Sequence, residues 1–290
     1  MTTMTRVRGQ DMFDLLRGES EQPRSRKPEI KIDLGLEKFI LTFLDLSKAL
    51  RDQDIGYYRD CYRACLTRVP AGAIKARDVE SFSLWLNDEV IKSQDDGLGP
   101  RNAGMYITML ASYCPEKEVT VHTRHLETRL DYLGCLLTDK HLIVKGDAGD
   151  CLGIGMLRNG LITVRGNARG WSGKCLDGGK IIVEGDNDNS VLGLFMTSGE
   201  IEVYGNVNGG AGNFMEGGRI KISGNVDGVI GNVMEGGEII IEGDVNRPIG
   251  PGMKNGTIRV YGKRPRVSEA IEGGVIYHRD RVIYDGRKSR

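Results

Sequence analysis

Aliphatic residues recur in pairs along the second half of the chain, and each pair stands four and two positions before a glycine. A spacing of two places both side chains of a pair on one face of a β-strand and turns the residue between them to the other face. The residue directly before each glycine, from Lys145 to Tyr261, suits a solvated outer face. The seven pairs are Leu142/Val144, Ile162/Val164, Ile181/Val183, Ile201/Val203, Ile220/Ile222, Ile239/Ile241 and Ile258/Val260. The pattern predicts a stack of short strands with one apolar face.

Glycines recur at a nearly fixed interval and divide each repeat into three parts. A third apolar position follows three residues after the second glycine of each repeat. A period of roughly 20 residues is typical of solenoids, and glycine suits their corners because it adopts positive φ without penalty. The first glycine series is Gly146, Gly166, Gly185, Gly205, Gly224, Gly243 and Gly262. The second glycine series is Gly153, Gly173, Gly193, Gly212, Gly231 and Gly250, and the third is Gly160, Gly179, Gly199, Gly218, Gly237 and Gly256. The apolar positions that follow the second series form a third apolar ladder, which consists of Met156, Leu176, Met196, Met215, Met234 and Met253. We therefore expect a three-sided parallel β-helix with an apolar interior.

Aspartate or asparagine follows the first glycine of six repeats. The six residues are Asp147, Asn167, Asp186, Asn206, Asn225 and Asp244. Their short side chains bond to local backbone, and stacked repeats would align them as a ladder along one edge. At the seventh repeat Lys263 takes this position and Pro265 follows, which predicts the end of the solenoid and a cap over its last coil.

The repeat contains two insertions of one residue. One lies between Gly153 and Gly160, and the other lies between Gly185 and Gly193. An inserted residue bulges out of a corner of a solenoid. We interpret the second bulge, residues 186–190, as slack that the fold tolerates, and a contact with a cofactor or partner is the alternative.

The first half of the chain has a different pattern. Residues 1–30 are polar and predict a flexible arm. Apolar residues with helical spacing predict helices over residues 36–50, 57–66, 78–92 and 102–113. The expected organisation is an α+β chain with an arm at 1–30, a small helical domain at 31–125 that caps the first coil, the β-helix at 126–275 and a basic tail at 276–290.

Candidate chemistry is sparse. The six cysteines are Cys61, Cys65, Cys114, Cys135, Cys151 and Cys175, and their spacing is unlike that of zinc or iron–sulfur sites, so we interpret them as small buried residues. His122 and His125 would point to opposite faces of a strand and would not share a metal. Asp78 and Glu80 are interpreted as a helix start. We expect no catalytic and no metal-binding residue, and the sequence identifies no cofactor-binding residue.

Charge and hydropathy limit the partners and the cellular location that we expect for the chain. The chain has 40 basic and 40 acidic residues, which indicates no nucleic-acid partner. Residues 263–290 carry an excess of four positive charges, interpreted as a solvated tail, with an acidic partner subunit or a polyglutamyl cofactor tail as the alternative. The sequence shows neither an apolar run that could cross a bilayer nor the apolar core of a signal peptide, so we expect a cytoplasmic protein without a membrane partner.

Four consecutive segments share one pattern, G-x-x-M-x-x-G-x-I-x-[VI]-x-G. They are Gly193–Gly205, Gly212–Gly224, Gly231–Gly243 and Gly250–Gly262. The pattern closely resembles the GXGXG β-helix family, which includes the β-helical subunit of formylmethanofuran dehydrogenase, its relative in the formyltransferase/hydrolase complex and the C-terminal domain of glutamate synthase large subunits. The resemblance covers about residues 130–275, and residues 1–125 depart from it.

The resemblance implies a right-handed, three-sided β-helix that acts as a scaffold without a catalytic centre of its own. It implies catalytic subunits as partners in a one-carbon enzyme complex, and those subunits would carry a molybdenum or tungsten pterin, iron–sulfur clusters and an amidohydrolase-like centre. One alternative is a stand-alone glutamate synthase subunit that supports ammonia transfer between glutaminase and flavin-binding chains. The other is a structural solenoid that assembles end to end.

Overall fold

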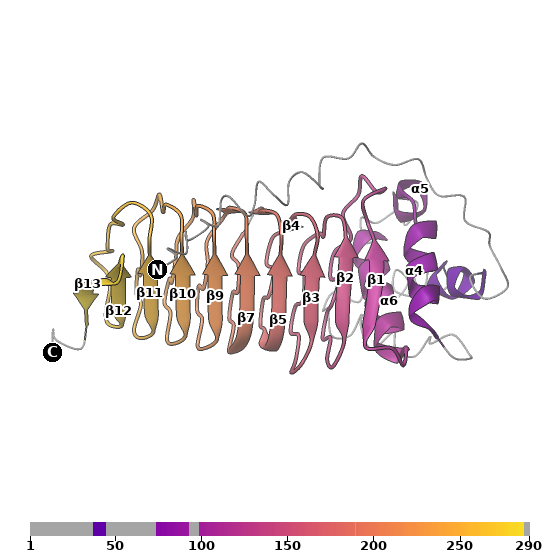
Figure 1. The fold of residues 1–290 in the computed structure, drawn as a ribbon, viewed down its shortest axis with the longest axis horizontal. Helices are drawn as coiled ribbons and strands as arrows, with labels where there is room; N and C mark the ends of the chain where they lie inside the picture. Colours follow the sequence, from indigo (N-terminus) through magenta and orange to yellow (C-terminus); the bar gives the residue numbers. More distant parts are fainter. Residues whose placement is uncertain (1–36, 45–73, 93–98, 189, 287–290) are drawn as a thin grey trace, which may run out of the picture.

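The computed structural model describes residues 37–44, 74–92, 99–188 and 190–286. The chain forms a parallel β-solenoid of about 8 turns with helices at its N-terminal end (Figure 1). Within the described part of the chain, no helix is both long enough and apolar enough to cross a membrane. The predicted arm and the predicted helix at 57–66 lie outside the described residues.

Three labelled helices precede the solenoid, namely α4 (Ala76–Trp85), α5 (Asp88–Lys92) and α6 (Gly99–Tyr113), and residues 37–44 are also helical. The predicted single helix over 78–92 is therefore two helices. The break falls where the side chain of Asn87 accepts a hydrogen bond from the Val90 N–H and starts a new first turn. Helix α6 begins before the predicted Asn102, because Pro100 fits the first turn of a helix, where its missing N–H is not needed.

The strands form one long sheet and one short sheet. The long sheet has the order β1 (Glu118–His122), β2 (His141–Lys145), β3 (Leu161–Val164), β5 (Asp177–Val183), β7 (Ser198–Val203), β9 (Arg219–Ile222), β10 (Glu238–Ile241), β11 (Thr257–Val260), β12 (Val275–His278) and β13 (Arg281–Asp285); the short sheet has the order β4 (Ala168–Arg169), β6 (Asn187–Asp188) and β8 (Val207–Asn208). Every pairing is parallel except that of β12 with β13. Equivalent repeat positions lie side by side, as Ile239 does between Ile220 and Ile258.

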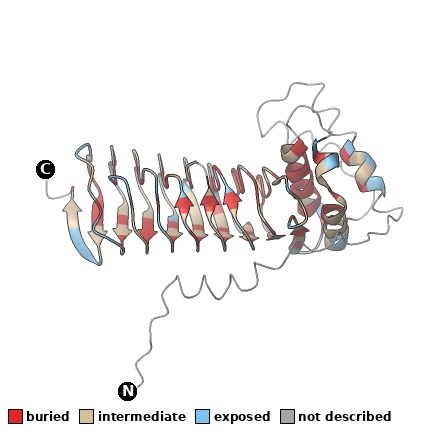
Figure 2. Cartoon of the chain, turned by 90° about the horizontal axis from the view of Figure 1, so that it is seen from above, coloured by how far each residue is buried: buried red, intermediate tan, exposed pale blue. Residues whose placement is uncertain are grey.

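The interior contains all three predicted apolar ladders. Each of their side chains, from Leu142 to Val260 and from Met156 to Met253, is fully buried. Figure 2 shows buried stretches, coloured red, recurring along the stacked strands. The inward assignment of these ladders is confirmed. Two further inward columns were not predicted, one running through Val207 and Val226 and the other through Leu192, Ala211, Ile230 and Ile249.

The glycines serve two different needs. In the second series, Gly212 has φ 66°, and a Cβ there would lie 2.4 Å from Cδ1 of Ile239, so the position needs both the left-handed backbone and the empty space. In the first series only Gly146 has positive φ, so the expectation of left-handed corners is wrong for the other six. A Cβ on Gly243 would lie 2.3 Å from the carbonyl oxygen of Gly224 in the coil before it. Close stacking of backbones requires glycine there.

The N-terminal end of the solenoid is covered by the helices. Helix α4 packs on β1, as the prediction of a helical cap requires (Figure 1). Strand β1 pairs with β2 although it lies within the range 31–125 that was assigned to the helical domain. The sheet therefore begins before residue 126.

The C-terminal end lies one coil beyond the predicted end at Pro265, because β12 adds to β11 in parallel. The chain then reverses through Arg279 and Asp280, whose φ values of 48° and 63° are those of a two-residue hairpin turn, and β13 returns antiparallel. The register of the hairpin shifts between Ile276 and Tyr277, which marks a bulge. Most of the predicted tail at 276–290 thus belongs to the sheet, and residues 287–290 lie outside the described part.

Candidate functional site

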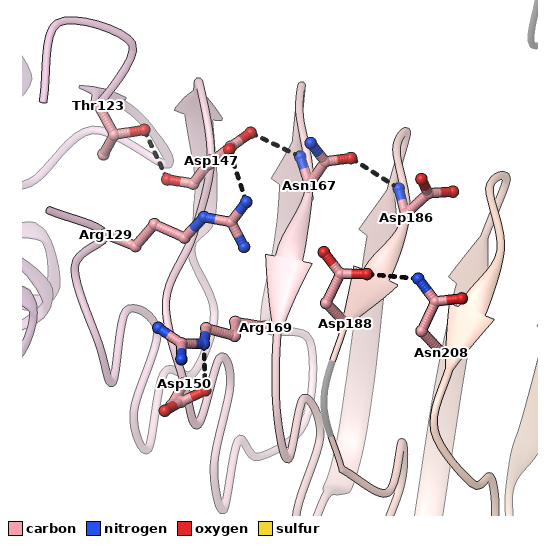
Figure 3. A network of polar contacts seen from close by, with 9 residues as sticks. All are labelled: Thr123, Arg129, Asp147, Asp150, Asn167, Arg169, Asp186, Asp188 and Asn208. Atoms are coloured by element: carbon pink, nitrogen blue, oxygen red, sulfur yellow. Dashed lines mark hydrogen bonds and ion pairs between the residues drawn. The ribbon is translucent and has the colours of Figure 1, made fainter. Parts of the chain in front are cut away.

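The predicted ladder of aspartate and asparagine is confirmed (Figure 3). In each rung the Oδ1 atom accepts a hydrogen bond from the backbone N–H of the next rung. The distances are 2.8 Å from Asp147 to Asn167, 2.9 Å from Asn167 to Asp186, 2.6 Å from Asp186 to Asn206, 2.9 Å from Asn206 to Asn225 and 2.8 Å from Asn225 to Asp244. Because one oxygen of every rung is bonded to backbone, the ladder holds the coils together.

Basic residues close both ends of this ladder. Nη2 of Arg129 lies 3.0 Å from Oδ2 of Asp147 at the first rung (Figure 3). At the last rung Asp244 accepts the Lys263 N–H at 2.7 Å, and the Lys263 ammonium lies 2.9 Å from its second oxygen. The hydrogen bonds from Lys263 lower the pKa of Asp244. Lys263, which we associated with the end of the repeat, therefore continues the ladder by one rung.

The bulge at 186–190 is tied to the neighbouring coils. Asp186 is a rung of the ladder, and Asp188 accepts a hydrogen bond from the Asn208 side chain at 2.7 Å (Figure 3). Asn187 points into the interior and is fully buried, where its Oδ1 accepts a hydrogen bond from the Ser172 hydroxyl at 2.7 Å. Residue 189 is outside the described part. The carboxylates of the bulge and Oδ1 of Asn187 thus serve contacts within the solenoid, whereas the buried Nδ2 of Asn187 has no hydrogen-bond partner among the described residues.

Titratable residues near the N-terminal end of the solenoid form hydrogen bonds that join the helices to it. Glu80 Oε1 lies 2.7 Å from His122 Nε2, and His125 Nε2 lies 2.9 Å from the carbonyl oxygen of Leu86. Strand β1 ends at His122, so the expected alternation of faces does not extend to His125. Asp78, predicted as a helix start, accepts the Lys75 N–H at 2.9 Å and does lie in the first turn of α4.

Asp88 forms the most hydrogen bonds at this junction between the helices and the solenoid. Its two oxygens accept the N–H groups of Glu127 and Thr128 at 2.7 to 3.1 Å. Partial burial raises the pKa of Asp88, but the backbone hydrogen bonds outweigh it, and the pKa lies below its ordinary value. The charged carboxylate therefore stabilises the junction between α5 and the loop after β1.

The four cysteines within the described residues form no disulfide. Cys114, Cys135 and Cys151 are buried and Cys175 is half-buried. Burial raises the pKa of Cys114 and of Cys151 to about 11. Cys61 and Cys65 lie outside the described part, and within it no group of three or more His, Cys, Asp or Glu residues could hold a metal ion.

The outer face of the long sheet carries charges that are matched across neighbouring strands. The ion pairs are Lys180 with Glu200 and Glu202 at 3.1 and 3.0 Å, Arg219 with Glu238 at 3.4 Å, Arg259 with Glu238 at 2.9 Å and Lys221 with Glu242 at 3.0 Å. Every pair joins neighbouring coils, either directly across the strands, as Arg219 and Glu238 do, or diagonally, as Lys180 and Glu202 do. This face is a solvated surface whose charges compensate one another.

A different edge of the solenoid exposes apolar side chains. Cys175, Phe195, Phe214 and Val233 occupy the same repeat position in four successive coils, one residue before the third apolar ladder, and we call them the aromatic edge. All four have φ between 53° and 57°. The rings of Phe195 and Phe214 are stacked with centroids 5.1 Å apart, and these residues are 45% and 40% exposed. The edge is the candidate functional site of the described chain.

No family model matches the chain. No curated protein matches it either. The aromatic edge was missed by sequence reasoning, which assigned Cys175 to the repeat but gave the neighbouring phenylalanines no role. The signal lay in the repeat itself, because Gly155 and Gly252 occupy the position of Phe195 and Phe214 in other coils.

Proposed function

We propose that the chain is a non-catalytic scaffold subunit of a multi-subunit one-carbon enzyme complex, similar to the β-helical subunit of formylmethanofuran dehydrogenase. The observation that carries the proposal is that the repeat builds the interior of the solenoid. Its inward positions form one continuous apolar core, from Leu142 in β2 to Ile276 in β12. Such a core gives a long, rigid body whose function lies on its outer surfaces.

The proposal includes a right-handed, three-sided solenoid, as the family resemblance implies. Three parallel registers along the solenoid support the three sides. They are the long sheet, the short sheet with its continuation from Val207 through Val226 to Val245, and a column of bridges from Leu192 through Ala211 and Ile230 to Ile249.

The catalytic centres and cofactors of the complex would belong to its other subunits, namely a molybdenum or tungsten pterin, iron–sulfur clusters or flavin. Location in the cytoplasm is part of the same proposal. The expectation that neither nucleic acid nor membrane is a partner also stays a prediction.

The structural alternative, end-to-end assembly of solenoids, is less favoured by the two ends. Helix α4 covers β1, and the other end finishes in the hairpin of β12 and β13. A bulge and charged residues such as Arg281 make β13 a poor template for another strand. The remaining alternative, a glutamate synthase subunit that supports ammonia transfer, differs from the first proposal in its partners.

Purification of the chain from its native host under mild conditions separates these possibilities. Subunits that co-elute in fixed ratio are identified by mass spectrometry, and the metals in the same fraction are measured. Molybdenum or tungsten with iron supports the one-carbon complex, whereas glutaminase and flavin-binding chains support the glutamate synthase alternative. A chain that elutes without any partner contradicts both.

A further inference from the structure

We propose that the aromatic edge is the docking surface for a partner subunit, and that the partner presents an apolar groove bordered by lysine or arginine side chains. The proposal rests on the scaffold function above and names the surface that performs it. Exposed clusters of large apolar side chains on a soluble protein mark sites of contact with other molecules.

The fold itself does not need the two phenyl rings. Gly155 and Gly252 take the same left-handed conformation at the same repeat position, with φ of 61° and 63°. Glycine adopts this conformation freely, whereas a residue with a Cβ is strained in it. Phe195 and Phe214 therefore place exposed rings where the coil would be satisfied by glycine, and strain of this kind accumulates at functional positions.

The geometry of the rings selects the kind of partner. The planes of Phe195 and Phe214 are inclined by only 28° in a stacked arrangement, so each ring covers one face of the other. Bases and other planar ligands bind aromatic side chains by stacking on a ring face. The stacked pair instead forms a ridge, which suits burial in the apolar groove of another protein.

The charges beside the ridge select the rim of that groove. Asp177, Glu216 and Glu235 stand two residues after Cys175, Phe214 and Val233, and all three are exposed. Glu235 pairs with Lys254 at 2.7 Å. Asp177 accepts a hydrogen bond from the Thr197 hydroxyl at 2.9 Å, and the described residues place no cation within ion-pair distance of Asp177 or Glu216. Basic side chains on the partner would compensate these carboxylates.

Other outer surfaces are less suited to the role. The long sheet compensates its own charges, as between Lys180 and Glu202, and the ends of the solenoid are closed by α4 and by β13. The aromatic edge combines exposed apolar area with carboxylates that no described cation neutralises.

The test uses the full chain expressed in its native host and purified with its stoichiometric partners. The double variant Phe195→Gly, Phe214→Gly is compared with wild type and with Val282→Ala, which changes an exposed apolar residue in β13, outside the aromatic edge. We expect the double variant to melt at the wild-type temperature or above it, since glycine relieves the left-handed strain, and to bind the partner at least about 30-fold more weakly, the effect of losing one interface hot spot. Val282→Ala keeps the partner. Glu216→Lys weakens binding without a change in melting temperature.

A photo-crosslinking residue at position 214 identifies what lies against the edge. The expected adduct joins the co-purifying subunit at a peptide that contains aliphatic and basic residues. Crosslinks to a second copy of this chain or to its own terminal segments overturn the proposal, and so does a marked fall in the melting temperature of the double glycine variant. If partners co-purify undiminished with that variant, the docking proposal fails while the scaffold function stands. If wild type has no partner, the scaffold function fails and the docking proposal fails with it.

Discussion

Replacing Gly212 with alanine tests how the repeat packs its interior. The Cβ of the alanine would lie 2.4 Å from Cδ1 of Ile239, and the backbone there has φ 66°. The left-handed conformation costs about 1–2 kcal/mol for a residue with a Cβ, and overpacking of a core adds about 1–3 kcal/mol. We expect Gly212→Ala to lower the free energy of unfolding by about 2–5 kcal/mol.

The substitution Ile239→Val removes the methyl group that causes the clash and by itself costs about 0.5–1.5 kcal/mol. In the double variant the backbone strain remains but the clash disappears, so it should be about 1–3 kcal/mol more stable than the two single effects predict when added. Gly231→Ala is the matched control, because it has φ 64° and its Cβ would meet Cδ1 of Ile258 instead. Ile258→Val should restore part of the stability that Gly231→Ala loses, and Ile239→Val should not.

The assay is urea unfolding followed by far-ultraviolet circular dichroism, with the same slope required for all variants before midpoints are converted into free energies. A double variant as unstable as the sum of its single changes would contradict the interlocking of glycine and isoleucine. So would rescue of Gly231→Ala by Ile239→Val.

Three further predictions use other contacts. Asn225→Ala removes the acceptor of the Asp244 N–H and should lower the free energy of unfolding in urea by about 0.5–1.5 kcal/mol. Asn225→Asp keeps an acceptor and should be near wild type. An equal loss of stability in both variants would contradict the stabilising role of the ladder. The pKa of Asp88 in the folded protein lies below the ordinary value of 3.8, so the charged carboxylate stabilises the fold fully above that ordinary value. This stabilisation is lost as the pH falls through the pKa of the folded state. The difference in unfolding free energy between wild type and Asp88→Ala should therefore be constant above pH ~5 and shrink in acid. A difference independent of pH down to full protonation would contradict the role of the charge. Iodoacetamide at pH ~8 should modify Cys175 in the native protein and Cys151 only in urea, because burial raises the pKa of Cys151 to about 11; equal native labelling in peptide mass spectra would contradict this.

The core could be predicted from the sequence because it depends on backbone geometry alone. A period of two within a longer, nearly constant repeat decides which side chains face inward, as Ile220 and Ile239 do. The two additional inward columns escaped because they combine different residue types, such as Ala211, Ile230 and the buried Asn187, and so gave no uniform apolar signal.

The end of the solenoid escaped for a different reason. Pro265 and the basic residues near it predict a stop, but proline is tolerated in the loop that precedes β12. The interval from Gly256 to Gly274 is shorter by one than the interval from Gly237 to Gly256, so the last coil departs from the period that defined the others.

The aromatic edge could not be predicted from residue preferences, because phenylalanine and valine disfavour the left-handed backbone found at Phe214 and Val233. Tertiary stacking of the coils imposes that conformation on whichever residue stands there. Exposure of the rings follows from the same stacking, and its one signal is the comparison between repeats, in which Gly155 and Gly252 hold the same position.

The scaffold claim is tested most directly by removing the chain from its host and measuring whether the catalytic subunits still associate. Sedimentation of the extract, with each subunit quantified by mass spectrometry, gives the answer, and re-expression of the wild-type chain is the control. We expect the catalytic subunits to be made but to sediment apart, and re-expression to restore the complex. Catalytic subunits that sediment together without this chain would contradict this expectation.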